Sequence, residues 1–169
     1  MKILLMSDTH GHGTNTKKLL ERYKNEADIV CHSGDGAGDL LKLEREYPML
    51  RMEAVPGNVD YSILMDTEII LNLQSEGFEK PIRILLVHGH HFGVKSGLDR
   101  LISYAKRLGV DACFFGHTHK PVCENVDGLF IMNPGSLKYP DGERFTCTYG
   151  LVQITPDGEI SGEHFDIES

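Results

Sequence analysis

Aspartate, asparagine and histidine residues recur along the sequence in short segments, and several follow runs of apolar residues. In chain order they are Asp8 and His10, Asp35, Asn58 and Asp60, His88 and His90, and His117 and His119. Carboxylate, amide and imidazole groups together suit divalent ions of the manganese, iron, cobalt, nickel and zinc group. Two such ions held close together generate a hydroxide and stabilise displacement at phosphorus. These residue types therefore indicate metal-dependent hydrolysis of a phosphate ester.

The spacing within these segments supports the same interpretation. Asp8-Thr9-His10 and His117-Thr118-His119 each place two donors two positions apart. In an extended chain alternate side chains point to one side, so both donors of each segment would face the same way. Glycines next to the donors would let the backbone turn sharply and approach the ions; they are at positions 11, 34, 57, 89 and 116.

The elements that must position these donors can be read from the first third of the chain. Short apolar runs predict strands at 2–7, 28–32 and 50–55, and helical spacing predicts helices at 15–26 and 37–46. This alternation favours a parallel sheet flanked by helices. Ligands of such sheets bind outside the carboxyl ends of the strands, where these donors lie.

The rest of the chain has a different pattern. Three further strands are expected, at 67–74, 82–87 and 111–115. A helix is expected over 96–108, with Ser96 as its N-cap and Gly109 as its end. Beyond it, Asp127-Gly128 and Asp157-Gly158 are hairpin dipeptides, so the C-terminal third should be mostly antiparallel.

Composition limits the class of protein. The chain has 169 residues, of which 40% are hydrophobic and 25% charged, so we expect a single globular domain over residues 1–169. The net charge of −8 disfavours anionic membranes and tight non-specific binding of nucleic acid. Without a long apolar run or a signal-peptide core, the expected location is the cytoplasm. The four cysteines contain no CxxC pair and are expected to be free thiols, and the oligomeric state is left open.

The order Asp-x-His, Gly-Asp, Gly-Asn, His and Gly-His-x-His resembles the calcineurin-like metallophosphoesterase superfamily. The segments SDTHG, GNVD, HGH, GHTH and NPGS resemble its small bacterial and archaeal phosphodiesterase branch, to which the retromer scaffold subunit is also similar. The resemblance extends from Ile3 to about Ser136. It implies an α/β fold, a two-sheet β-sandwich flanked by helices. It also implies a phosphodiesterase that acts on a small phosphate ester and uses two divalent ions. Manganese is the first candidate for these ions, and nickel, iron, cobalt and zinc are the alternatives.

The family pattern also implies roles for individual residues. One ion would be held by Asp8, His10, Asp35 and His119. The second would be held by Asp35, Asn58, His88 and His117, so that Asp35 bridges both. Asp35 and Asn58 would thereby serve catalysis. His90 would either orient a ligand or meet the phosphate, and Asp60 would either orient an active-site group or lie in solvent.

Two positions depart from the family pattern. Many members have histidine after the Gly-Asn pair, where it assists the leaving group, but this chain has Val59, which cannot donate a proton. Members of this branch often have a Pro-Arg pair after the NPGS segment, which is absent here, and Lys138 or Arg144 could substitute for that arginine.

Several other side chains have simpler interpretations. His32, in a strand, is expected to be a hydrogen-bonded structural histidine, and His164 is expected at the surface. Five methionines are expected in the core: Met6, Met49, Met52, Met65 and Met132.

The sequence alone leaves two rival functions open. A non-catalytic scaffold could keep the fold and bind partners through a surface patch, although it would have no chemical need for the seven donors. A phosphomonoesterase or nucleotide hydrolase would use the same metals on another ester. Metal content and turnover of an activated phosphodiester would discriminate between these possibilities.

Overall fold

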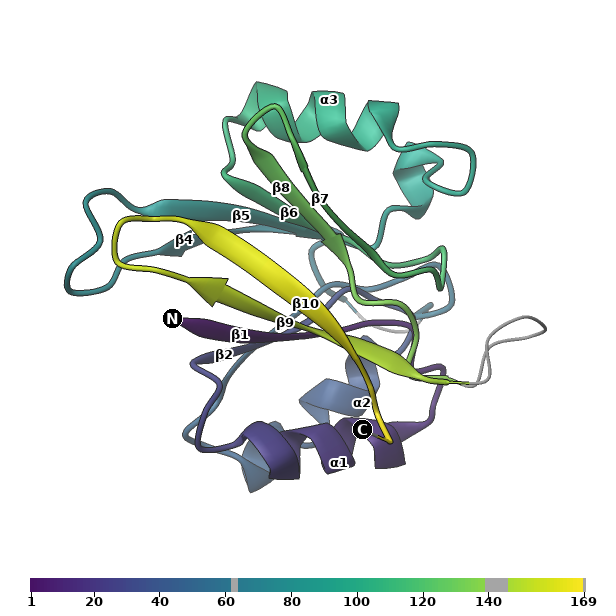
Figure 1. Cartoon of the computed structure of the whole chain (residues 1–169). Helices are drawn as coiled ribbons and strands as arrows, with labels where there is room; N and C mark the ends of the chain where they lie inside the picture. The colour runs from purple at the N-terminus through teal and green to yellow at the C-terminus, as the bar shows by residue number, and fades with distance from the viewer. Residues whose placement is uncertain (62–63, 139–145, 169) are drawn as a thin grey trace.

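Two five-stranded β-sheets pack face to face, with helices on both outer faces (Figure 1). This computed structural model describes residues 1–61, 64–138 and 146–168. Helices α1 (Gly13–Tyr23) and α2 (Ala37–Leu41) cover the first sheet, and α3 (Asp99–Leu108) covers the second. The expected two-sheet sandwich flanked by helices is confirmed.

The first sheet has the order β10-β9-β1-β2-β3. Its strands are β1 (Lys2–Met6), β2 (Ile29–His32), β3 (Arg51–Ala54), β9 (Thr148–Ile154) and β10 (Ile160–Asp166). The pairs β1–β2 and β2–β3 are parallel, whereas β1–β9 and β9–β10 are antiparallel. The carboxyl ends of β1, β2 and β3 therefore meet at one edge, as the alternating pattern predicted.

The second sheet has the order β4-β5-β6-β8-β7. Its strands are β4 (Glu68–Leu73), β5 (Ile82–Val87), β6 (Ala112–Phe114), β7 (Val122–Val126) and β8 (Leu129–Asn133). Strands β5, β6 and β8 run parallel to one another. The β7–β8 hairpin turns at Asp127 and Gly128, both with positive φ, as the dipeptide predicted.

Strand β1 explains why its sequence is a continuous apolar run. Ile3 and Leu5 point into the core between the two sheets, and Leu4 and Met6 point toward α1 and α2. All four side chains are fully buried. Burial of one such side chain stabilises the fold by about 1.5–3 kcal/mol. This rigid strand ends directly before the first candidate ligands.

Some local expectations were wrong. Helix α3 begins at Asp99, not at Ser96, because Gly97, which would follow a Ser96 cap as the first helical residue, has φ +150 and is not helical. It ends at Gly109 in the left-handed conformation, as expected. Met49 is 93% exposed, outside the core, whereas Met6 and Met132 are buried as expected. The four cysteines are free.

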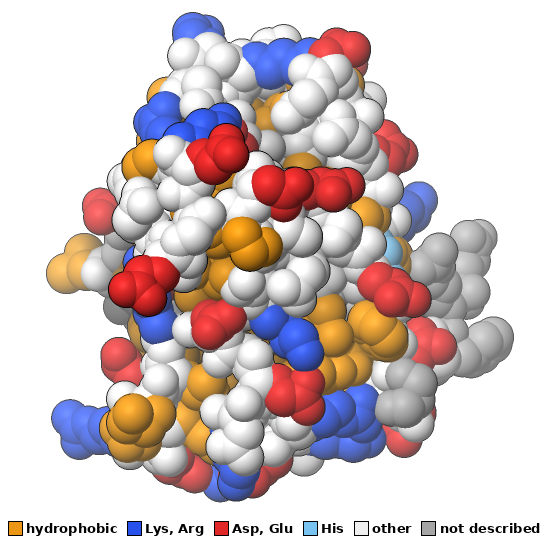
Figure 2. Space-filling model, turned by 60° about the vertical axis from the view of Figure 1, so that its left-hand side comes forward, with side chains coloured by type: hydrophobic (Ala, Val, Ile, Leu, Met, Phe, Trp, Pro, Cys, Tyr) orange, Lys and Arg blue, Asp and Glu red, His pale blue; other side chains and the backbone are white. Residues whose placement is uncertain are grey.

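The surface carries charges of both signs. On the face shown in Figure 2, acidic and basic side chains are interspersed, and no basic patch dominates. Within the described residues, no helix combines the length and apolar character that a membrane crossing requires.

Candidate metal centre

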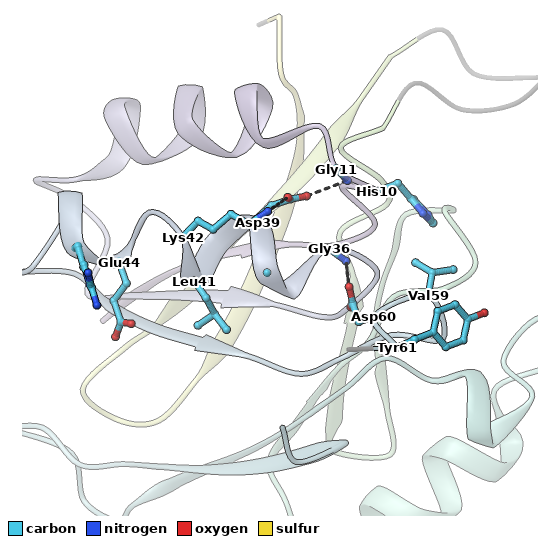
Figure 3. A pocket seen from close by; sticks show the side chains of 12 residues that line it. His10, Gly11, Gly36, Asp39, Leu41, Lys42, Glu44, Val59, Asp60 and Tyr61 are labelled. Atoms are coloured by element: carbon cyan, nitrogen blue, oxygen red, sulfur yellow. Dashed lines mark hydrogen bonds and ion pairs between the residues drawn. The ribbon is translucent and has the colours of Figure 1, made fainter. Parts of the chain in front are cut away.

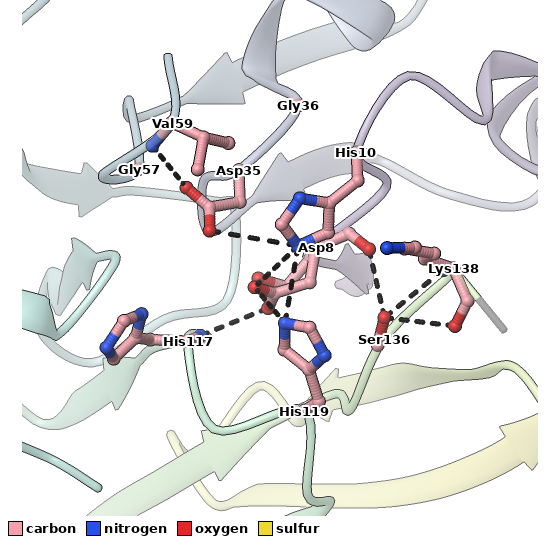
Figure 4. A network of polar contacts seen from close by, with 12 residues as sticks. Asp8, His10, Asp35, Gly36, Gly57, Val59, His117, His119, Ser136 and Lys138 are labelled. Atoms are coloured by element: carbon pink, nitrogen blue, oxygen red, sulfur yellow. Dashed lines mark hydrogen bonds and ion pairs between the residues drawn. The ribbon is translucent and has the colours of Figure 1, made fainter. Parts of the chain in front are cut away.

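The candidate ligands all lie in the loops that follow strands. Asp8 and His10 follow β1, Asp35 follows β2, Asn58 follows β3, His88 follows β5, and His117 and His119 follow β6. Strands β1 to β3 belong to one sheet and β5 and β6 to the other, so both sheets deliver their loops to the same place (Figure 4).

Six of these side chains form two compact groups. The first group is Asp8, His10 and His119, and the second group is Asp35, His88 and His117. Within each group, one nitrogen or oxygen atom per residue lies within 4.8 Å of the others. Each group has the size and donor types of a site for one divalent ion.

The backbone of these loops adopts an unusual conformation. Six described non-glycine residues have positive φ: Asp8, His10, Asp35, His117, His119 and Asp127. Asp127 belongs to a hairpin turn, and the other five are members of the two groups. Such residues each cost about 1 kcal/mol or more, and they cluster at functional sites because the surrounding structure must hold them in place.

In the first group, Asp8 is held by one of its two carboxylate oxygens. Oδ2 accepts hydrogen bonds from the Ser7 hydroxyl at 2.6 Å and from the His117 N–H at 3.0 Å. Oδ1 is buried and has no hydrogen-bond partner. It lies 3.1 Å from Nε2 of His119 and 3.9 Å from Nε2 of His10. Those two nitrogens are themselves 3.3 Å apart.

In the second group, the His88 ring is oriented by the backbone. Its Nδ1 lies 2.7 Å from the Ser33 carbonyl oxygen, which can only accept, so Nδ1 carries the proton. In the neutral ring, Nε2 therefore presents a lone pair. This nitrogen is 3.4 Å from Asp35 Oδ2 and 3.2 Å from both Asn58 Oδ1 and His117 Nδ1. Asn58 thus lies beside the second group.

Asp35 lies between the two groups. Its Oδ1 accepts the Val59 N–H at 3.0 Å. Its Oδ2 is 3.4 Å from His88 Nε2 and 3.8 Å from His10 Nε2, so one oxygen faces both groups. A side chain at Gly57 would clash with Oδ1 of Asp35, so only glycine allows this close approach.

The pKa values follow from burial and charge. Burial would raise the pKa of Asp35, but His88 and the Val59 N–H outweigh it and lower the value to about 2. Burial would lower the pKa of His88, but the hydrogen bond with Asp35 and the charge of Asp8 outweigh it, so this pKa is raised. The site thus favours a positive charge between His88 and Asp35.

Two partly buried histidines of the groups, His10 and His117, are shifted toward the neutral form. Burial lowers the pKa of His10 more than the charges of Asp35 and Asp8 raise it. Burial and the charge of His88 lower the pKa of His117 to about 4. Neutral imidazole nitrogens are the form that binds metal ions.

These observations fit the presence of two divalent ions. Buried Asp8 Oδ1 lacks a hydrogen-bond partner, although buried carboxylate oxygens are normally satisfied. In the second group, Nε2 of His88 in its neutral form and Oδ2 of Asp35 are two acceptors that face each other. A cation in each group would satisfy both arrangements. The chemistry of the donors, imidazole with carboxylate, admits several transition metals.

Asp60 and His90 lie outside the two groups. The Asp60 carboxylate accepts the N–H groups of Gly36 at 3.0 Å and Gly57 at 2.8 Å, so it ties together the loops that follow β2 and β3. The ring of His90 is 5.3 Å from that of His88, and its buried Nδ1 has no hydrogen-bond partner.

His32 and His164 take part in hydrogen bonds. His32 is fully buried, and its Nδ1 accepts the Gly34 N–H, as expected of a structural histidine. His164, expected at the surface, is half-buried, and its Nε2 lies 2.7 Å from the Asn133 carbonyl oxygen.

The loop after β8 supports Asp8, which the sequence did not predict. Ser136 Oγ and the Lys138 N–H both donate to the Asp8 carbonyl oxygen, at 2.9 and 3.2 Å. The Lys138 side chain extends beside His10 (Figure 4), and its charge contributes to lowering the pKa of His10. Arg144, the other candidate cation, lies outside the described residues. The only signal for the Ser136 contact was its place in the NPGS segment.

Known proteins share this sequence and fold. Probable metallophosphoesterase YsnB of Bacillus subtilis is 32% identical over 158 residues, which cover 93% of this chain and 86% of that protein. Phosphodiesterase YfcE of Escherichia coli is 30% identical over 169 residues, which cover 90% of this chain and 87% of that protein.

A solved structure from Streptococcus pneumoniae, described as a predicted phosphoesterase, has a TM-score of 0.74 and 25% identity and covers 98% of this chain and 97% of that chain. The family match itself is to the calcineurin-like phosphoesterase superfamily domain, and it extends over residues 1–157. This chain therefore belongs to the calcineurin-like phosphoesterase superfamily.

Proposed function

We propose that this protein is a phosphodiesterase that holds two divalent ions and hydrolyses a small phosphate ester in the cytoplasm. The observation that carries the proposal is the placement of Asp35 Oδ2, which faces His88 at 3.4 Å and His10 at 3.8 Å. A carboxylate oxygen that faces both donor groups would let Asp35 serve two ions held close together.

The ligands divide between two ions in this proposal. The first ion is held by Asp8, His10, Asp35 and His119, and the second by Asp35, Asn58, His88 and His117. Manganese is our first candidate, and nickel, iron, cobalt and zinc suit the same donors. Bound there, the ions would supply a hydroxide as the nucleophile and offset the negative charge that develops on the phosphoryl oxygens.

The protein's own residues hold this arrangement ready. The Ser33 carbonyl fixes the His88 ring, and the Val59 N–H fixes Asp35. Asp60 holds the loops that carry Asp35 and Asn58 at a constant separation, so we propose it as a positioning residue. Lys138, beside His10, adds a positive charge at the edge of the site that would attract a phosphate anion.

The leaving group receives little help from this chain. The Val59 side chain lies beside the metal centre and cannot donate a proton (Figure 4). His90 is the nearest other candidate for a catalytic role, but burial and its neighbours His91 and His88 lower its pKa, so it is neutral at pH 7. We therefore propose that the leaving oxygen departs largely as an anion.

The experiment is to measure metal content and turnover together. Purified protein is loaded with manganese, and its activity is measured on a bis-aryl phosphodiester and on the corresponding aryl phosphomonoester. Two ions per chain and faster turnover of the diester would support the proposal. Faster turnover of the monoester would favour a phosphomonoesterase. Bound metal without turnover of either ester would favour the scaffold alternative.

A further inference from the structure

A pocket of about 920 Å³ opens beside the first group, and His10 is part of its lining (Figure 3). Its other walls come from α2, from the residues directly before and after this helix, and from residues 59–61. Pockets that bind small molecules have volumes of about 300–1,000 Å³. There is therefore room beside the metal centre for an organic group much larger than a phosphate.

The wall nearest to His10 is apolar and exposed to solvent. Four large hydrophobic side chains in the described part of the chain are exposed: Met49, Val59, Tyr61 and Leu64. Val59 and Tyr61 both line the pocket, and they are 41% and 89% exposed. Figure 3 shows them next to each other, on the same side as the His10 ring. Exposed apolar side chains that gather beside a polar site indicate a binding surface.

This wall has a defined position relative to the metal centre. The Val59 N–H donates to Asp35, which lies between the two groups. The next residue, Asp60, accepts the N–H groups of Gly36 and Gly57. A ring that contacts Val59 and Tyr61 would therefore lie at a constant distance from a phosphate at the metal centre.

Two of the three acidic side chains that line this pocket, Asp39 and Asp60, are already hydrogen-bonded. Asp39 accepts from the Thr9 hydroxyl at 2.8 Å and from the Gly11 N–H at 2.9 Å. Asp60 accepts backbone N–H groups at 2.8 to 3.1 Å. A neutral ring in the pocket would not have to displace these partners.

We propose that this pocket binds one of the two organic groups of a phosphodiester, and that this group is a planar aromatic ring stacked on Tyr61. A nucleobase or an aryl ester has this chemistry. The inference rests on the proposed function, because the phosphate must occupy the metal centre for the ring to reach the pocket. Aromatic side chains stack on planar rings without regard to their exact substitution, so the pocket selects for a ring and not for one base.

The test is a binding titration that needs no turnover. Metal-loaded protein is titrated with inorganic phosphate, methylphosphonate and phenylphosphonate, which share the anionic group and differ in the organic part. We expect phenylphosphonate to bind about tenfold more tightly than methylphosphonate, within the range measured for stacking on an aromatic side chain.

Three variants locate the source of the preference. Tyr61→Ala should reduce the preference to less than about twofold, whereas Tyr61→Phe should keep it because the ring remains. Met49→Ala removes another exposed apolar side chain, at a residue outside the pocket lining, and should also keep the preference.

The outcomes separate this inference from the proposed function. Equal binding of the two phosphonates, or a preference that survives in Tyr61→Ala, would overturn the aromatic pocket while phosphate binding remains intact. Failure of all three anions to bind the metal-loaded protein would overturn the proposed function, and this inference with it.

Discussion

The second group of ligands is anchored by the backbone, whereas the first group is open on one side. The His88 side chain is fully buried and is hydrogen-bonded to the Ser33 carbonyl, and Asp35 accepts the Val59 N–H. In the first group, the side chains of His10 and His119 are 21% and 32% exposed, and Asp8 Oδ1 has no hydrogen-bond partner.

This difference separates two ways of preparing a metal site. In the second group the His88 ring and the Asp35 carboxylate are already oriented, so an ion that binds there has less to order. In the first group, Asp8 Oδ1 has no hydrogen-bond partner and the rings of His10 and His119 are partly exposed, so the ion itself must orient these side chains. We therefore expect the second group to bind its ion more tightly, and the first group to be the one that exchanges metal.

The largest effect should come from Asp35, a member of the second group whose Oδ2 also faces the first group. Asp35→Asn removes a negative charge that faces both ions, so metal binding in both groups should weaken. Loss of several kcal/mol of charge stabilisation predicts a fall in kcat/KM of about a thousandfold or more. Asp127→Asn, which changes an exposed carboxylate paired with Lys106, is the matched control. Undiminished activity of Asp35→Asn would remove the bridging role.

The next effect concerns Val59, whose N–H anchors the second group while its side chain faces the pocket beside the first. Because valine cannot act as an acid, rates should depend steeply on the pKa of the leaving group. General acid assistance is worth about 10²–10⁴ in rate, so Val59→His, which keeps the N–H, should help alkyl phosphodiesters more than aryl ones.

A series of leaving groups, measured on both proteins with saturating metal, tests this. If the rates of the unmodified protein depend only weakly on the pKa of the leaving group, another residue already protonates the leaving group. Alanine substitution of His90, of its neighbour His91 and of His12, which directly precedes α1 in the loop that carries His10, would then identify it.

A third effect is on stability and concerns His32, which supports both groups. Its ring lies 3.3 Å from the Thr9 hydroxyl and accepts the Gly34 N–H, and complete burial lowers its pKa to about 4. The unfolded chain, with a histidine pKa near 6.5, binds a proton that the folded protein excludes. Stability from this residue is therefore complete above about pH 6.5 and is lost as the pH falls toward 4, by up to about 3 kcal/mol.

Denaturant unfolding of the metal-free protein between pH 4 and 7 checks this effect. The slope of stability against pH should be smaller in His32→Gln than in the unmodified protein. Identical slopes in the two proteins would assign the loss to other groups.

The smallest effect should distinguish the two groups from each other. Ser7→Ala removes the hydroxyl that donates to Asp8 Oδ2, so metal affinity of the first group should fall by about 10–100-fold while the second group is unchanged. Ser33→Ala is a close control, because the Ser33 hydroxyl is buried without a hydrogen-bond partner. Equilibrium dialysis against limiting metal measures both. Equal losses in the two variants would contradict the assigned role of Ser7.

The clustering of the ligands could be predicted from the sequence because each ligand follows a strand. Parallel strands end at one edge, so Asp8, Asp35 and Asn58 had to lie near each other. The anchoring contacts could not be predicted, since they join distant residues. The Ser33 carbonyl and His88 are 55 positions apart, and His164 meets Asn133 across the two sheets. The prediction of Ser96 as the N-cap failed because Gly97, the next residue, has φ +150, which no helical residue adopts.

The most direct test of a two-ion centre bridged by Asp35 is a metal titration of the metal-free protein. We expect two ions per chain at saturation. We also expect that His119→Ala loses the weaker ion and that His88→Ala loses the tighter one. Saturation at one ion per chain in the unmodified protein would contradict the account, whatever the activity of the enzyme.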